Sequence, residues 1–225
     1  MMNPTETTLH EGLAALALEL ESGAVQKLLD YQALMGKWTQ VYNLTAVRDP
    51  ADMLTHHLLD SLAVISPLQR YLRHANLAAN ASLLDVGSGA GLPGVVIAIC
   101  CPDVQVTCVD AVAKKVAFIK QAALALKLPN LTGLHARVEA IEQPFDVVCS
   151  RAFASLADFT QWSQKALSPV GVWMAMKGKH PDQERAALAP STEVFHVEPL
   201  HVPGLGAERC LLWMRPNRHP CEAIT

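Results

Sequence analysis

A glycine-rich turn and two carboxylates are the residues of this chain best suited to bind a ligand. The stretch 82–94, SLLDVGSGAGLPG, is a short apolar run that passes directly into glycines. Asp85 lies just before Gly87, and Asp110 ends the next β-rich run, 104–110. Such a turn brings backbone N–H groups close to an anion, and an acid at the end of the second strand binds ribose hydroxyls. The combination predicts a nucleoside-containing ligand.

Two classes of nucleoside ligand fit a turn of this kind. Gly89–Gly94 is a literal Gly-x-Gly-x-x-Gly, which is typical of dinucleotide binding, but the glycines begin earlier, at Gly87. Asp85 would repel a pyrophosphate and suits an ammonium or sulfonium. We therefore expect S-adenosylmethionine, with its carboxylate at the N–H groups of the turn, its ammonium towards Asp85 and its ribose on Asp110. A dinucleotide, or a turn needed only for packing, remains the alternative.

The elements that position these residues alternate between strand and helix patterns. Strands are predicted at 82–86, 104–110, 131–136, 145–150, 172–177, 193–200 and 210–215. Helices are predicted from Pro93 onwards, over 111–128, near 155–167 and near 181–189, with a Pro169/Gly171 turn before the fifth strand. This alternation predicts a doubly wound α/β sheet, in which ligands bind at the carboxyl ends of the strands.

The N-terminal part has helical periodicity instead. Helices are predicted near residue 9, over 24–42 and over 51–65, and 74–82 is predicted to be a loop. In the third helix the apolar stripe consists of Leu54, Leu58, Leu62 and Ile65.

Composition excludes several classes of protein. The net charge of −3 argues against a wholly basic nucleic-acid binder but allows a local basic patch. No apolar stretch is long enough to span a membrane and the N-terminus has no basic signal-peptide region, so we expect a cytoplasmic protein that does not bind membranes. The six cysteines contain no C-x-x-C pair and are expected to be buried reduced thiols, and the histidines lack metal-ligand spacing, so no metal is expected.

Cations follow three successive strands, where the second substrate of such a fold binds. Arg137 and Glu139 follow the third strand, Arg151 the fourth, and Lys177 and Lys179 the fifth. These cations favour a polyanion such as RNA, whereas solvated loop charge is the alternative. The motifs used to methylate exocyclic base amines and pyrimidine carbon are absent around Cys149, which is expected to be a packed thiol.

Several motifs together resemble the RsmG (GidB) family of bacterial 16S rRNA guanine-N7 methyltransferases. The resemblance runs from about residue 40 to Arg209. It rests on Asn43-Leu-Thr-Ala-Val-Arg48, His57-Leu-Leu-Asp60-Ser61-Leu62, Leu84-Asp-Val-Gly-Ser-Gly-Ala-Gly-Leu-Pro-Gly94, Lys114-Lys115 with Phe118, Arg137-Val-Glu139, Ser150-Arg-Ala-Phe153 and Lys177-Gly178.

The resemblance implies a Rossmann-like class I S-adenosylmethionine-dependent methyltransferase. Its seven-stranded, mostly parallel sheet would occupy 81–225, with a helical extension over 1–80 in one compact unit. The implied substrate is N7 of a guanine in the decoding-region loop of 16S rRNA, naked or in the 30S particle, and the enzyme is expected to be a monomer. Guanine N7 has no proton, so no general base is needed.

The resemblance also implies residue roles. Carried over position by position, cofactor contacts fall at Gly87, Leu92, Val138, Glu139 and Arg151, beside Asp85, Gly89 and Asp110 from the turn. We expect RNA contacts from Arg137, Lys177, Arg48 and Arg209, and positioning of the base by Arg151, Lys177 and Arg137. Asn43, Arg48 and His57 are expected to shape the cofactor lid or the RNA surface. A small-molecule or protein methyltransferase, or an NAD-dependent oxidoreductase, remains the alternative.

Overall fold

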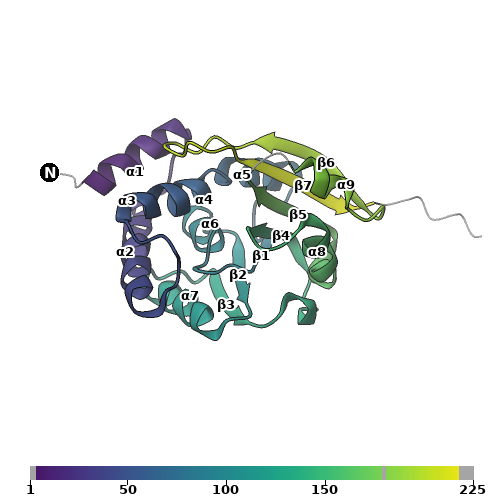
Figure 1. Cartoon of the computed structure of the whole chain (residues 1–225), viewed down its shortest axis with the longest axis horizontal. Helices are drawn as coiled ribbons and strands as arrows, with labels where there is room; N and C mark the ends of the chain where they lie inside the picture. Colours follow the sequence, from purple (N-terminus) through teal and green to yellow (C-terminus); the bar gives the residue numbers. More distant parts are fainter. Residues whose placement is uncertain (1–3, 179–180, 218–225) are drawn as a thin grey trace, which may run out of the picture.

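The computed structural model describes residues 4–178 and 181–217 and has a seven-stranded sheet at its centre (Figure 1). Across the sheet the order is β3-β2-β1-β4-β5-β7-β6, parallel from β3 to β5, with β7 antiparallel to both of its neighbours. The chain order reverses between β1 and β4, and ligands of open α/β sheets bind outside such a switch point. The strands are β1 Ser82–Val86, β2 Gln105–Asp110, β3 Leu131–His135, β4 Phe145–Arg151, β5 Leu167–Lys177, β6 Thr192–Pro199 and β7 Cys210–Pro216.

Helices precede the sheet and connect its parallel strands. A π-helical segment, Leu54–Leu59, joins α3 to α4, and single 3₁₀ turns occur at Val138–Ala140 and Gln164–Ala166. The helices are α1 Pro4–Ala15, α2 Ala24–Tyr42, α3 Pro50–Met53, α4 Asp60–Leu62, α5 Ile65–His74, α6 Gly94–Cys100, α7 Ala113–Ala125, α8 Leu156–Trp162 and α9 Asp182–Ala186.

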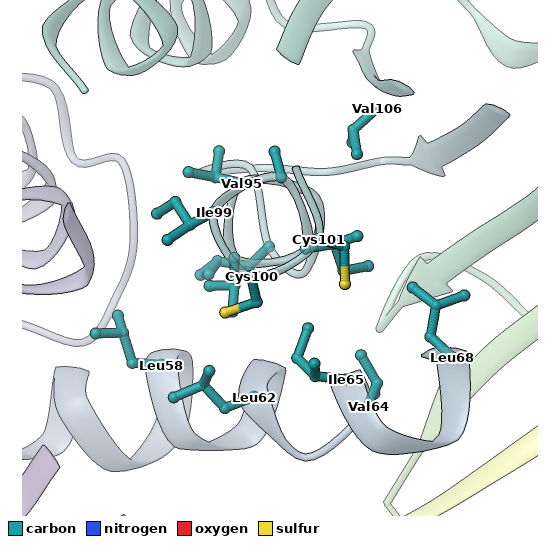
Figure 2. Packing of buried hydrophobic residues seen from close by; sticks show 14 of the residues in the cluster. Leu58, Leu62, Val64, Ile65, Leu68, Val95, Ile99, Cys100, Cys101 and Val106 are labelled. Atoms are coloured by element: carbon teal, nitrogen blue, oxygen red, sulfur yellow. The ribbon is translucent and has the colours of Figure 1, made fainter. Parts of the chain in front are cut away.

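The sheet is buried on both faces, as its alternating strand residues require. Cys108 packs in the cluster that contains α2, α5, α6 and α7, and its neighbour Val109 packs with α8 on the opposite face. The N-terminal helices share the first of these cores. Figure 2 shows Leu58, Leu62 and Ile65 directed towards α6. The helices before β1 are therefore built onto the sheet domain through one hydrophobic cluster.

The structure differs from the predicted elements in two places. The helical run does not end at residue 65: α5 continues to His74, because Leu68 and Leu72 extend the buried stripe and Pro67 lies in the first turn, where its missing N–H is tolerated. The turn predicted at Pro169/Gly171 is instead a bulge inside β5. Phe145 pairs with Leu167 and Val147 pairs with Val172, so the intervening residues of β5 have no counterparts on β4.

Candidate active site

Two adjoining clefts lie at the carboxyl edge of the sheet, on either side of the turn that follows β1. The large cleft has a volume of about 560 Å³ and lies between this turn, the ends of β4 and β5, and the N-terminal helices. The small cleft has a volume of about 320 Å³ and extends over the ends of β2 and β3. Gly87 and Ala152 line both clefts. A ligand could therefore span the two at Gly87.

The backbone conformation at Gly87 and the close approach of Phe153 exclude any residue with a side chain at this position. Its φ is +65°, and a Cβ atom there would lie 2.2 Å from Cδ2 of Phe153. The Phe153 ring thus lies against Gly87, where the two clefts meet, and makes edge contacts with Phe159 and Trp162. The sequence predicted the glycine but assigned no role to either Phe153 or Trp162, although both line the small cleft.

The N–H groups of the glycine turn are mostly used inside the protein. Those of Gly87 and Ser88 donate to the carbonyl of Val109, and that of Gly89 donates to Asp110. The N–H groups of Gly91 and Leu92 donate to the Ser88 carbonyl. The prediction that the turn offers these groups to a carboxylate is therefore wrong. A carboxylate in the large cleft would meet side-chain cations instead, while Gly89 and Leu92 line the cleft with their other atoms.

Asp85 does not face a ligand as predicted. It is completely buried beneath the turn and lines neither cleft. Its Oδ2 accepts a hydrogen bond of 2.8 Å from the N–H of Gly94, while its Oδ1 has no partner among the described residues. Burial raises the pKa of Asp85 from 3.8 to about 7, although the Gly94 N–H and the Arg151 charge oppose the rise. Asp85 thus fixes the start of α6.

This burial predicts a pH dependence of stability that Asp85→Asn removes. Because the pKa of Asp85 is higher in the folded than in the unfolded chain, the folded state holds the extra proton between about pH 4 and 7. The free energy of unfolding therefore falls as pH rises through that window. Asparagine keeps an acceptor for Gly94 and does not ionise. We expect its melting temperature, relative to wild type, to be a few degrees higher at pH 8 than at pH 5. An equal difference at both values would contradict a buried titrating carboxyl.

Asp110 is held rigidly at the edge of the small cleft. Its Oδ2 accepts from the N–H of Gly89 at 3.0 Å, its Oδ1 accepts from the N–H of Val112 at 2.8 Å, and Lys115 Nζ lies 3.5 Å from Oδ2. A carboxylate has about four acceptor positions, so others remain for ribose hydroxyls. Val138, Glu139 and Arg137 line the same cleft. The resemblance implies cofactor contacts for the first two, which remain a prediction.

An arginine–aspartate–arginine cluster borders the large cleft. Asp60, 3% exposed, accepts from Arg151 Nη1 at 2.8 Å through Oδ2 and from Arg209 Nε at 2.9 Å through Oδ1. Arg151 also donates to the carbonyl of His56 in the π-helical segment, at 2.9 Å. The cluster carries one net positive charge and ties the N-terminal helices to β4 and to the β6–β7 connection. The role of Asp60 was not predicted, because its partners lie far away in the chain.

The other predicted cations have different positions. Lys177 lines the large cleft and donates to the Ala154 carbonyl at 2.8 Å and to Glu184 Oε2 at 2.7 Å. Arg137 is exposed beside the small cleft. Arg48 lies at neither cleft and donates to Asn43 Oδ1 at 2.7 Å. Lys179 lies outside the described residues. Of the cations predicted after the three strands, Arg151 and Lys177 therefore line the large cleft and Arg137 the small one, and Arg209 joins the first two.

His57 is a neutral residue of the large cleft. Burial, followed by the charge of Arg151, lowers its pKa from 6.5. Its Nε2 lies 2.8 Å from the hydroxyl of Thr45, and both side chains line the cleft. His57 therefore holds the loop after α2 against the cleft.

Five cysteines of the described part of the chain are buried and form no disulfide there: Cys100, Cys101, Cys108, Cys149 and Cys210. Cys221 lies outside the described residues. Residues 4–178 and 181–217 contain no group of three or more metal-ligating side chains. None of the helices described has the length and apolarity needed to cross a bilayer.

The two clefts fit S-adenosylmethionine. The small cleft offers the carboxylate of Asp110 for a ribose, and the buried Val138 and the aromatic rings of Phe153 and Trp162 for a base. Gly87 lines both this cleft and the cationic large cleft. When bound, this cofactor supplies an electrophilic methyl group on a sulfonium. Fold and site together define a class I S-adenosylmethionine-dependent methyltransferase.

Solved structures share this fold. Magnesium protoporphyrin IX methyltransferase (ChlM) of Synechocystis PCC 6803, solved with bound SAM, is 10% identical with a TM-score of 0.58, covering 83% of this chain and 97% of that chain. TrmN of Thermus thermophilus is 19% identical with a TM-score of 0.55, covering 72% of this chain and 53% of that chain.

Sequence comparison gives the family. The family model for rRNA small subunit methyltransferase G (GidB) matches residues 24–212. Ribosomal RNA small subunit methyltransferase G of Polaromonas sp. (strain JS666) is 71% identical over 95% of both chains, and that of Albidiferax ferrireducens is 65% identical over 96% of this chain and 99% of its own. The chain therefore belongs to the rRNA small subunit methyltransferase G (GidB) family, which confirms the resemblance of its motifs.

Proposed function

We propose that this protein transfers a methyl group from S-adenosylmethionine to N7 of a guanine in 16S rRNA. The relatives' name supports rRNA of the small subunit as the substrate. The observation that carries the choice of N7 is the state of the acids and bases around the large cleft. Asp60 is bound by two arginines, Glu184 by Lys177, and the neutral His57 by Thr45. Each of these three side chains is already engaged, whereas His56 is an exposed histidine that also lines the cleft.

Guanine N7 is the base atom that such a site suits. It carries an in-plane lone pair and no proton, so its bond to the methyl carbon forms while the carbon–sulfur bond breaks, with the electron pair left on sulfur, and no proton is removed. Catalysis then rests on orientation in a cleft. Methylation of a hydroxyl or amine group also requires the loss of a proton from the acceptor, which a positioned base accelerates.

The cations of the large cleft supply the orientation. An arginine or lysine that donates to guanine O6 distinguishes guanine from adenine, and we propose Arg151 or Lys177 for this contact. Arg209 and Arg137 would bind phosphates on either side. The guanidinium cannot also bond N7, because that lone pair attacks the methyl carbon. The base must leave its stack to reach the cleft.

For the cofactor we propose contacts at Gly87, Gly89, Leu92, Asp110, Val138, Glu139 and Arg151. The net charge of −3 and the small set of cleft cations favour a structured ribonucleoprotein over naked RNA as the substrate. We further propose that residues 1–80 and 81–225 form one compact unit, which the shared hydrophobic cluster supports.

An acceptor comparison tests the proposal. Label transfer from S-[methyl-³H]adenosylmethionine is measured with 16S rRNA and with 30S particles, both from cells that lack the modification, and with a panel of small acceptors and proteins. We expect incorporation into the RNA-containing substrates, greater for the particle. Transfer only to small molecules or proteins would contradict the proposed acceptor. Tighter binding of NAD⁺ than of S-adenosylhomocysteine would contradict the proposed cofactor.

A further inference from the structure

A second pocket lies on the N-terminal side of the molecule, apart from both clefts. It has a volume of about 560 Å³ and is lined by α2, by the loop that follows it, by Thr5 of α1 and by α3. We call it the N-terminal pocket and define it by Gln32, Gly36, Lys37, Thr39, Arg48 and Pro50. None of these residues lines the large or the small cleft.

Two buried polar atoms of this pocket have no partner among the described residues. Gln32 is 6% exposed; its Nε2 donates to the Pro50 carbonyl at 2.6 Å, while its Oε1 accepts nothing. Thr39 is 2% exposed, and its Oγ1 is also unpaired. Buried polar groups are almost always hydrogen-bonded. An acceptor and a hydroxyl left unpaired in one pocket therefore indicate a ligand with its own donor and acceptor.

The remaining features of the pocket favour a nucleotide. A Cβ atom on Gly36 would have no neighbour within 4 Å, so the helix leaves open space there. Lys37 and Arg48 are exposed cations at the edge of the pocket, and Arg48 donates one hydrogen bond to Asn43 Oδ1. An amide oxygen and a hydroxyl can read a base edge, while lysine and arginine bind phosphates.

The position of the pocket relates it to the large cleft. Leu44 and Thr45 line the large cleft, whereas Arg48, in the same loop, and Pro50, the first residue of α3, line the N-terminal pocket. One RNA segment could therefore contact both sides of this loop.

We propose that the N-terminal pocket binds an unstacked nucleobase of the rRNA substrate, a second base beside the one that is methylated. Its amino group donates to Gln32 Oε1, Thr39 Oγ1 bonds a ring acceptor, and Lys37 and Arg48 bind the adjoining phosphates. This inference rests on the proposed function, because it requires an RNA substrate.

Filling the pocket tests the inference. Gly36→Leu places a side chain in the open space, and Gly36→Ala is the matched control that leaves most of that space free. We expect Gly36→Leu to raise the KM for unmethylated 30S particles at least tenfold, with unchanged affinity for S-adenosylhomocysteine, and Gly36→Ala to behave like wild type. Leucine and alanine both favour a helix over glycine, so neither should lower the melting temperature. An unchanged KM in folded Gly36→Leu would overturn the inference.

A second variant removes the hydrogen bond without changing the shape. Thr39→Val keeps a β-branched side chain and the backbone carbonyl that caps α2. We expect a three- to tenfold increase in the same KM, and this result decides the matter if Gly36→Leu does not fold. A wild-type protein inactive on every rRNA substrate would refute the proposed function itself, whereas an active wild type with both variants equally active would refute only the pocket.

Discussion

Asp60→Asn lowers kcat/KM for methyl transfer about 100-fold while the protein stays folded. The carboxylate of Asp60 is the shared acceptor that holds Arg151 at 2.8 Å and Arg209 at 2.9 Å. An amide offers one acceptor, presents N–H groups to the second guanidinium and carries no charge. Two arginines left without their common anion separate, and breaking a buried charge pair costs about 3 kcal/mol or more. That cost lowers the free energy of unfolding, whereas the expected 100-fold fall in kcat/KM corresponds to about 2.7 kcal/mol of transition-state stabilisation, lost when the guanidinium groups move.

Steady-state kinetics on 30S particles, together with a melting curve, measure this effect. Asp146→Asn is the control, since Asp146 accepts from the N–H and hydroxyl of Ser82 at the start of β1, at the edge of the sheet opposite the clefts. We expect this control to lose stability and to keep kcat/KM. If Asp60→Asn reached wild-type kcat/KM, the arginines would not need their shared carboxylate, and the cluster would be structural only.

Asp110→Ala weakens S-adenosylhomocysteine binding by roughly 10- to 100-fold, or about 1–3 kcal/mol. The change removes the acceptor proposed for the ribose and also the partner of the Gly89 and Val112 N–H groups. Both losses affect the small cleft. Isothermal titration calorimetry measures the change directly.

The control for this titration is Asp103→Ala. Asp103 is an exposed acid just before the start of the same strand, β2, and lines neither cleft. Its replacement should leave the affinity unchanged. Equal affinities for wild type and Asp110→Ala would place the ribose elsewhere and refute the proposed arrangement of the cofactor.

Local pattern was enough to predict the sheet and its ligand-binding edge. Gly87, Asp110 and Arg151 lie at or just after the ends of predicted strands. Because these strands are parallel, the three residues meet at the carboxyl edge of the sheet. The continuation of the helix through α5 was missed, because Pro67 resembles a terminator unless its place in the first turn is known.

Long-range pairing was not predictable from spacing. Asp60 pairs with Arg151 and Arg209, which are distant in the chain, and no local sequence pattern indicates this pairing. The same holds for Asp85, which the sequence places at a strand end but which the fold buries against Gly94. Arg48 shares its loop with Thr45, yet lies on the other side of it. Which of two faces a loop residue occupies depends on packing that only the three-dimensional structure supplies.

The most direct test of the account is to locate the transferred methyl group. Unmethylated 30S particles are incubated with the enzyme and labelled S-adenosylmethionine, and the 16S rRNA is digested to nucleosides for mass spectrometry. If the enzyme methylates guanine N7, we expect label in 7-methylguanosine alone, at up to one methyl group per rRNA. Label on an exocyclic amine, a ribose hydroxyl or a carbon atom would contradict it, because each of those acceptors must lose a proton, whereas guanine N7 carries none.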